Sequence, residues 1–313
     1  MSGVEIVKVK SEDDGIRLNR WFLKYYPGLS LGRLQKLLRT KQVKVDGSRA
    51  ETNLRLVAGQ EIRVPPLDNE KCEMRPKGLS DDDKKYILDM VIYKDDDIIV
   101  LNKPSGLAVQ GGTNTKRHVD GFLEALKFGL EEKPKLVHRI DKDTSGILVV
   151  AKNDFTHTRL SEQFAEHTID RIYQAFVWGY VQKTSGLVIG DIGRSPHNRQ
   201  KMAIVANGKK AVTHYERMAV FGGGIASHIQ CILETGRTHQ IRVHMSSIGH
   251  SLIGDPIYGT IPKMAPDFAK YFPRQALHAG FLGFTHPRTG ERLSFEAPLP
   301  EDMQELLNQL SNL

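Results

Sequence analysis

The sequence predicts an α+β protein of two domains: a small helix-helix-strand domain, then a larger domain built on a mixed, mainly antiparallel sheet. Its 313 residues suit two domains of roughly 150 residues each. Apolar residues recur at helical spacing near the N-terminus, whereas short β-rich runs, one of them at 241–243, alternate with loops and a few helices after residue 91. We expect helices to pack at the edges of this sheet and a cleft to lie across it.

Two short helices are predicted in the first domain. Their apolar positions, spaced three or four apart, are Leu18, Trp21, Phe22 and Tyr25 in the first helix and Leu31, Leu34, Leu37 and Leu38 in the second. Ser30 stands where an N-cap is expected. Alternating valines before the Asp46-Gly47 turn and the apolar pair Ile62 and Val64 indicate two strands.

Positive charge is concentrated in this first domain. The chain carries a net charge of +7 and has a pI near 9.2. Between residues 17 and 49 there are nine basic residues and one acid, Asp46, so this window accounts for the basic character of the chain. Arg33, Lys36 and Arg39 fall three apart on one face of the second helix, and Arg17 precedes the first. We expect these four residues to contact the phosphates of a nucleic acid.

The segment from Leu136 to Gly146, followed by an apolar run, predicts a strand-turn-strand unit that holds Asp141 at a rigid turn. A calcium loop is disfavoured because its twelfth position, which should be glutamate, is Lys152. A glycosidase pair with Asp143 is disfavoured because alternate residues of an extended segment point to opposite faces. A purely structural turn remains the alternative to a catalytic carboxylate.

No motif for a nucleotide, a redox cofactor or a catalytic metal is present, so we expect a reaction that needs no cofactor and no metal. Cys72 and Cys231 are far apart and show neither disulfide nor zinc spacing. The sequence shows no signal peptide and no stretch of about 18 apolar residues that would predict a membrane span. A cytoplasmic protein is the expectation.

Several motifs together resemble the RluA-type RNA pseudouridine synthases. They are the central segment 136–146, the Arg171-Ile172-Tyr173 segment, the run 233–244, the entry motif 102–107 and the closing motifs 254–259 and 277–279. The first domain is similar to the S4 RNA-binding domain that many bacterial members carry. The expected organisation is therefore an S4-like domain over 14–75, a linker over 76–90 and a catalytic domain over 91–313. The run of charges at 81–85 suggests that the linker is a flexible tether. The resemblance implies that the catalytic domain is a large α+β sheet domain with a central cleft.

The resemblance also implies roles for particular residues. Asp141 is the expected catalytic carboxylate, Arg237 its charge-assisted partner, and Tyr173 the aromatic residue against the target uracil. Arg139 is expected to enter the RNA stack in place of the extruded nucleotide. For His138, His239 and His244 we favour structural hydrogen bonding over catalysis.

The implied substrate is ribosomal RNA, free or in the assembling large ribosomal subunit, and the C-type branch of the family is favoured over the D-type branch. A family member acting on tRNA, a non-enzymatic RNA-binding or ribosome-assembly protein, and an RNA glycosidase that releases free uracil remain as alternatives. The sequence says nothing about the oligomeric state.

Overall fold

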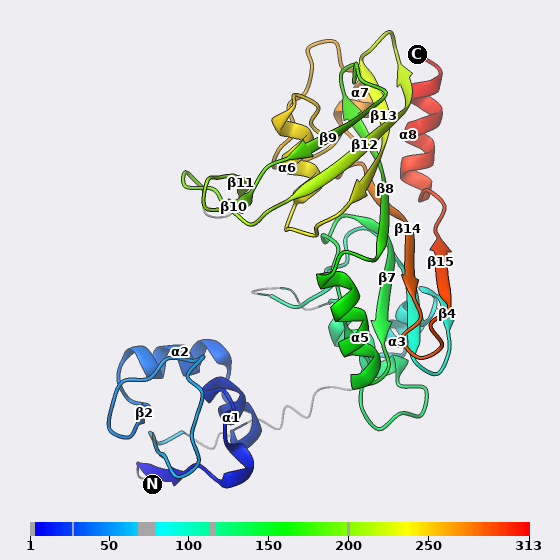
Figure 1. The fold of residues 1–313 in the computed structure, drawn as a ribbon. Helices are drawn as coiled ribbons and strands as arrows, with labels where there is room; N and C mark the ends of the chain where they lie inside the picture. Colours follow the sequence, from blue (N-terminus) through cyan, green and yellow to red (C-terminus); the bar gives the residue numbers. More distant parts are fainter. Residues whose placement is uncertain (1–3, 27, 68–78, 113–114, 116, 199–200) are drawn as a thin grey trace. The chain divides into compact units, whose positions relative to one another are not determined.

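The computed structural model describes residues 4–26, 28–67, 79–112, 115, 117–198 and 201–313 (Figure 1). The chain divides into two compact units, Met1–Gly78 and Leu79–Leu313. Cys72 and the first residues of the expected linker, 76–78, lie outside the described residues. Within the ranges given above, no helix is long and apolar enough to cross a membrane.

The first unit packs two helices against a small antiparallel sheet. Its elements are β1 (Glu5–Lys8), the 3-10 turn Ser11–Asp13, α1 (Leu18–Tyr25), α2 (Leu31–Arg39), β2 (Lys44–Val45) and β3 (Glu61–Val64), with strand order β1-β3-β2. The apolar stripes of both helices are buried with Val43, Leu56 and Ile62. The Ser30 side chain accepts a hydrogen bond from the backbone N–H of Arg33, which confirms the expected N-cap.

The second unit holds the remaining elements. Its strands are β4 (Val91–Lys94), β5 (Ile98–Lys103), β6 (Lys135–Leu136), β7 (Ser145–Ala151), β8 (Asp170–Trp178), β9 (Ser185–Ile189), β10 (Ile192–Arg194), β11 (Met202–Ile204), β12 (Val212–Phe221), β13 (Ala226–Leu233), β14 (Leu277–Thr285) and β15 (Arg292–Glu296). Its helices are α3 (Asp81–Leu88), α4 (Val119–Phe122), the 3-10 turn Leu123–Leu126, α5 (Asp154–Ala165), α6 (Gln240–Ser247), α7 (Asp267–Lys270) and α8 (Glu301–Ser311).

Ten strands form one large sheet, with main order β4-β5-β7-β14-β8-β13-β12-β9; β15 pairs with β14, and β6 with β7. Only the β7–β14 contact is parallel among the described pairings of this sheet, so the expected mixed, mainly antiparallel sheet is confirmed. Successive residues of β5 and β7 enter separate apolar clusters on opposite faces of the sheet. Burial on both faces explains why these strands are continuous apolar runs in the sequence.

Two expectations about local structure are wrong. The expected linker over 76–90 contains α3, whose Ser80 side chain caps the first turn and whose Ile87 is fully buried in the core of the second unit. Three aspartates at its N-terminus favour the helix through its dipole, although a run of charges suggested an unstructured tether. Residues 241–243, expected as a strand, belong to α6.

Candidate active site

Asp141 lies in the connection between β6 and β7, on a turn closed by a hydrogen bond from the backbone N–H of Thr144 to its carbonyl at 3.2 Å. The turn ends at Gly146, whose φ of +115° belongs to the region that glycine favours. A Cβ at this position would come within 2.2 Å of the Ala279 carbonyl oxygen, because β7 and β14 approach closely here. Asp141 is therefore placed where two strands from distant parts of the chain meet.

Two buried cations hold the backbone of this turn. The Lys103 Nζ donates to the carbonyls of Lys142 at 3.0 Å, Leu107 at 2.9 Å and Pro104 at 2.8 Å, and burial lowers its pKa to about 7. Three carbonyl acceptors require three N–H donors, which only the protonated amine provides. The positive charge of Lys103 is thus stabilised by the turn that it holds.

Arg274 is the second cation, and it connects the turn to the C-terminal helix. Its Nη1 donates to the Asp143 carbonyl at 3.1 Å, while Nε and Nη2 form a fork with the Asp302 carboxylate at 2.6 and 2.9 Å. Asp302 lies in the first turn of α8. The position of the Asp141 turn therefore depends on α8 as well as on β5.

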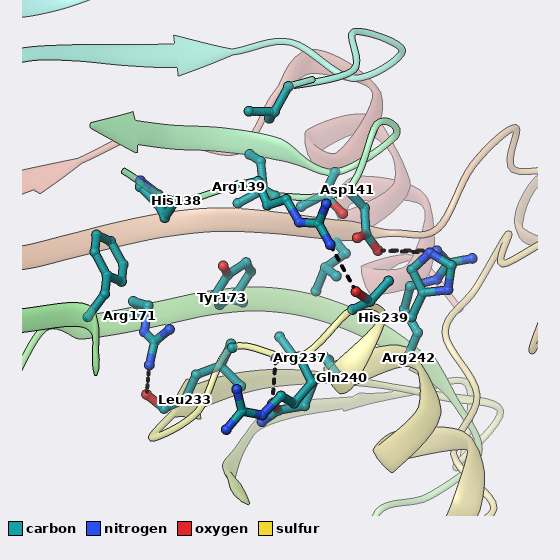
Figure 2. A pocket seen from close by; sticks show the side chains of 18 of the residues that line it. His138, Arg139, Asp141, Arg171, Tyr173, Leu233, Arg237, His239, Gln240 and Arg242 are labelled. Atoms are coloured by element: carbon teal, nitrogen blue, oxygen red, sulfur yellow. Dashed lines mark hydrogen bonds and ion pairs between the residues drawn. The ribbon is translucent and has the colours of Figure 1, made fainter. Parts of the chain in front are cut away.

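The guanidinium that contacts Asp141 belongs to Arg242. Its Nη1 lies 3.2 Å from Asp141 Oδ2 (Figure 2). Its Nε and Nη2 donate to the Asp255 carboxylate at 2.7 and 2.8 Å. The side chains of Arg242 and Asp255 are 4% and 0% exposed, whereas that of Asp141 is 24% exposed. One arginine therefore bridges a buried carboxylate and a carboxylate that opens into a cavity.

Burial alone would lower the pKa of Arg242, but hydrogen bonds and charge from Asp255 and Asp141 outweigh it and raise the pKa. Burial alone would raise the pKa of Asp255, and the hydrogen bonds from Arg242 reverse that effect and lower it. The Arg242–Asp255 pair therefore stays ionised, and it presents a fixed positive charge to Asp141.

Arg237, which we had expected beside Asp141, has a different partner. Its Nε donates to the Lys210 carbonyl at 3.0 Å, and its backbone N–H donates to Gln240 Oε1 at 3.0 Å. Arg237 nevertheless lines the same cavity as Asp141 and also a second hollow of about 410 Å³ beside it. The sequence interpretation missed Arg242 because the segment around it was taken for a strand.

Tyr173 and Arg171 extend from β8 into the same cavity (Figure 2). Tyr173 is 9% exposed, and burial raises its pKa to about 12, so its hydroxyl is protonated at neutral pH. Arg171 Nη2 donates to the carbonyls of Leu233 at 3.2 Å and Glu234 at 2.8 Å. These bonds hold the end of β13, from which the segment carrying Arg237 begins.

Arg139 is exposed at the rim of the cavity, where its Nη2 donates to Thr238 Oγ1 at 3.1 Å. The cavity measures about 660 Å³, within the range typical of small-ligand sites. Apolar side chains such as Ile140, Leu233 and Leu277 line it together with the charged groups. The cavity can therefore receive an aromatic base together with a polar sugar.

The expected structural hydrogen bonds are present for His138 and His244. His138 Nε2 accepts from the Val149 N–H at 3.0 Å while its ring stacks on Phe164, and His244 contacts Thr213 Oγ1 and the Gly190 carbonyl, each at 3.0 Å. His239 has such a bond as well, with its Nδ1 2.9 Å from the Tyr258 hydroxyl oxygen, but it differs from the other two in that its Nε2 also lies 3.9 Å from Asp141 Oδ2.

Acid should destabilise the second unit through two of its histidines. Burial lowers the pKa of His138 to about 3 and that of His228 to about 4 from an unfolded value of 6.5. The two neutral histidines contribute fully to stability above pH 6.5. As the pH falls from 6.5 towards 3 or 4, the free energy of unfolding decreases by up to about 1.4 kcal/mol per pH unit for each proton taken up. Urea unfolding at pH 7, 6, 5 and 4 measures it, and His138→Gln should reduce the slope. An unchanged slope in that variant would contradict the assignment.

The four basic residues expected to contact RNA in the first unit, Arg17, Arg33, Lys36 and Arg39, are all exposed. The last three lie on α2, opposite the buried Leu34 and Leu38. The helix therefore presents a basic face to solvent.

Comparison with known proteins identifies the family. Residues 97–247 match the family model described as RNA pseudouridylate synthase. The chain is 38% identical over 310 residues to "Uncharacterized RNA pseudouridine synthase YlyB" of Bacillus subtilis, covering 97% of both chains. It is 40% identical over 319 residues to "Ribosomal large subunit pseudouridine synthase D" of Zymomonas mobilis, covering 98% of this chain and 97% of the other.

Solved structures of lower identity share the fold. Human RNA Pseudouridylate Synthase Domain Containing 4 matches with a TM-score of 0.59 and 24% identity, covering 72% of this chain and 95% of the other. The human Domain Containing 1 protein matches with a TM-score of 0.55 and 23% identity, covering 71% and 94%.

The chain belongs to the RNA pseudouridylate synthase family, whose members are isomerases. The family expected from the motifs is confirmed. The expectation of the C-type branch is not supported. Relatives from Zymomonas mobilis, Pseudomonas aeruginosa and Escherichia coli are named "Ribosomal large subunit pseudouridine synthase D".

Proposed function

We propose that this chain converts uridine to pseudouridine in large-subunit ribosomal RNA, with Asp141 as the single catalytic carboxylate and without a cofactor. The names of the full-length relatives support the substrate and favour the D-type branch. The observation that carries the catalytic assignment is the contact of Asp141 with Arg242 at the wall of a cavity lined by Tyr173.

The reaction breaks the bond between uracil N1 and ribose C1′ and forms a bond between C5 and C1′. Asp141 either attacks C1′ or takes the proton from C2′ to give a glycal, and both routes need an ionised carboxylate. Arg242 stabilises that ionised form. The proton on C5 leaves to solvent after the new bond has formed, so its release reports the completed isomerisation.

The other residues at the cavity have separate roles in this proposal. The Tyr173 ring packs against the uracil, and its protonated hydroxyl donates a hydrogen bond. Arg139, exposed at the rim, fills the space that the flipped nucleotide leaves in the RNA. Arg237 lines both hollows, which suits contact with the phosphate or sugar of the same RNA strand.

Tritium release from RNA labelled at uracil C5 tests the proposal. The wild-type chain should release tritium from unmodified large-subunit rRNA, with pseudouridine in the digested product and no free uracil. Free uracil would identify a glycosidase instead. Release from tRNA but not from rRNA would move the substrate to the tRNA-modifying branch, and binding without release from either would favour an RNA-binding protein.

We further propose that the first unit is an S4-like RNA-binding domain, wider than the expected 14–75 because it includes β1, and that the second unit, which begins with α3 rather than at residue 91, is the catalytic part. Its support is the exposed basic face of α2 together with the excess of basic residues between 17 and 49. A face of this kind binds the phosphate backbone with little sequence readout and with strong salt dependence.

Reversing two charges on α2 should weaken RNA binding. Arg33→Glu with Arg39→Glu places repulsive charge at two phosphate contacts, so affinity should fall at least about tenfold at low salt and the slope of log K against log salt should flatten by roughly 1 to 2. Filter binding across a salt series measures both quantities. Arg33→Lys with Arg39→Lys keeps the charge and should bind almost as well as the wild type; equal binding by the glutamate variant would remove α2 from the RNA interface.

A further inference from the structure

His239 is a second polar group beside the candidate catalytic carboxylate. It precedes α6 in the left-handed conformation, with φ of 57° and ψ of 23°, which is uncommon for a residue other than glycine. Its side chain is 19% exposed and lines the cavity. Figure 2 shows His239 and Arg242 on the same side of Asp141.

Tyr258 determines which nitrogen of His239 carries the proton. The Tyr258 hydroxyl oxygen accepts a hydrogen bond from the Met202 N–H at 2.9 Å and lies 2.9 Å from His239 Nδ1. Burial raises the pKa of Tyr258 and keeps the hydroxyl protonated, so the hydroxyl can donate its own proton to Nδ1. Burial also lowers the pKa of His239, so the ring is neutral at pH 7, and with Nδ1 as the acceptor its single N–H is on Nε2.

The Nε2–H group faces Asp141 at a distance that does not make a direct hydrogen bond. Nε2 and Asp141 Oδ2 are 3.9 Å apart, against an upper limit of about 3.2 Å for a good N–H···O bond. A hydroxyl oxygen at about 2.8 Å from both atoms fits this separation, and it would accept from Nε2–H and donate to Oδ2.

We propose that His239, held as the Nε2–H tautomer by Tyr258, binds the ribose 2′-hydroxyl of the target uridine together with Asp141. This inference rests on the proposed function, because both routes place Asp141 at C1′ or C2′, next to the 2′-hydroxyl. A donor and an acceptor directed at one hydroxyl recognise ribose. When deoxyribose binds instead, the Nε2–H of His239 and the Oδ2 of Asp141 both lack the hydroxyl partner. His239 is then a specificity determinant for RNA at the reacting nucleotide.

The test uses two oligonucleotides that contain one mapped target uridine and differ only in a 2′-hydroxyl or 2′-hydrogen at that nucleotide. The Kd of the ribose RNA is measured with protein in excess in single-turnover reactions, and the inhibition constant of the deoxy RNA is measured against it, so the deoxy RNA need not react. The wild-type chain should bind the deoxy RNA about tenfold more weakly than the ribose RNA.

Two variants of His239 form a matched pair. Asparagine tolerates the left-handed backbone, so His239→Asn keeps the turn but does not reach the position of Nε2. It should bind the two RNAs within about twofold of each other. His239→Gln restores an N–H donor near the position of Nε2 and should recover part of the preference for ribose, whereas a purely structural histidine would not affect this ratio.

The outcomes separate this inference from the proposed function. If the wild-type chain forms no pseudouridine in the ribose RNA, the proposed function fails. If pseudouridine forms but His239→Asn keeps the full tenfold preference for ribose, the His239 inference is overturned while the proposed function stands. A wild-type chain that does not discriminate between the two RNAs also overturns it.

Discussion

Replacing Asp141 with asparagine should reduce the single-turnover rate of pseudouridine formation by about 10⁴-fold or more. Asparagine has nearly the same shape, and its amide oxygen can still accept the hydrogen bond from Arg242, so the turn should keep its conformation. The neutral amide, however, neither attacks C1′ nor removes a proton from C2′. The measurement is tritium release with the protein in excess over RNA, and RNA affinity should change by less than about threefold.

Asp143→Asn is the matched control for this prediction. Asp143 lies in the same turn, but unlike Asp141 it does not line the cavity, and Arg274 contacts its backbone carbonyl rather than its carboxylate. The control should therefore keep most of the activity. Comparable losses in the two variants would show that the turn needs both carboxylates for its structure, and would withdraw the catalytic role from Asp141.

Replacing Arg242 with glutamine should both stop turnover and destabilise the second unit. The Asp255 side chain is fully buried, and removing its cation leaves a buried charge without compensation, which costs about 3–5 kcal/mol of unfolding free energy. Asp141 loses its positive partner in the same variant. Urea unfolding and single-turnover kinetics measure the two effects.

A double variant separates stability from catalysis. Arg242→Gln combined with Asp255→Asn replaces the buried ion pair with a neutral hydrogen-bonding pair and should recover much of the lost stability. Turnover should stay low because Asp141 still lacks its cation. Arg237→Ala, which removes a guanidinium that contacts the Lys210 carbonyl, should retain more activity than either Arg242 variant. If turnover returned with stability in the double variant, Arg242 would be a structural residue only.

The elements that the sequence predicted well have one clear apolar pattern. Helices α1 and α2 each have a single buried stripe, and β5 and β7 are continuous apolar runs because both of their faces are covered. The turn that carries Asp141 was recognisable because a polar segment closed by Gly146 separates two such runs. These signals are local, so the sequence alone is enough to find them.

Helix α6 shows why the rest could not be predicted. Six of its eight residues are buried, among them Gln240, Arg242 and His244, so no polar face marks it as a helix. The amide nitrogen of Gln240, the guanidinium of Arg242 and the ring of His244 have partners 13 to 101 positions away in the chain. Arg237 was assigned as the partner of Asp141 from the family resemblance, and only the folded chain shows that the guanidinium of Arg242 reaches the carboxylate.

The hydrogen bonds from Arg274 to the Asp143 carbonyl and to Asp302 set the order in which parts of the protein can form during its synthesis. Lys103, which also holds the turn that carries Asp141, precedes Asp141 in the chain, but Arg274 and Asp302 emerge from the ribosome long after it. Because chains fold from the N-terminus as they are made, the basic first unit can form early. Under the proposed function, a nascent chain can therefore bind RNA through its first unit before Arg274 and Asp302 fix the turn that carries Asp141.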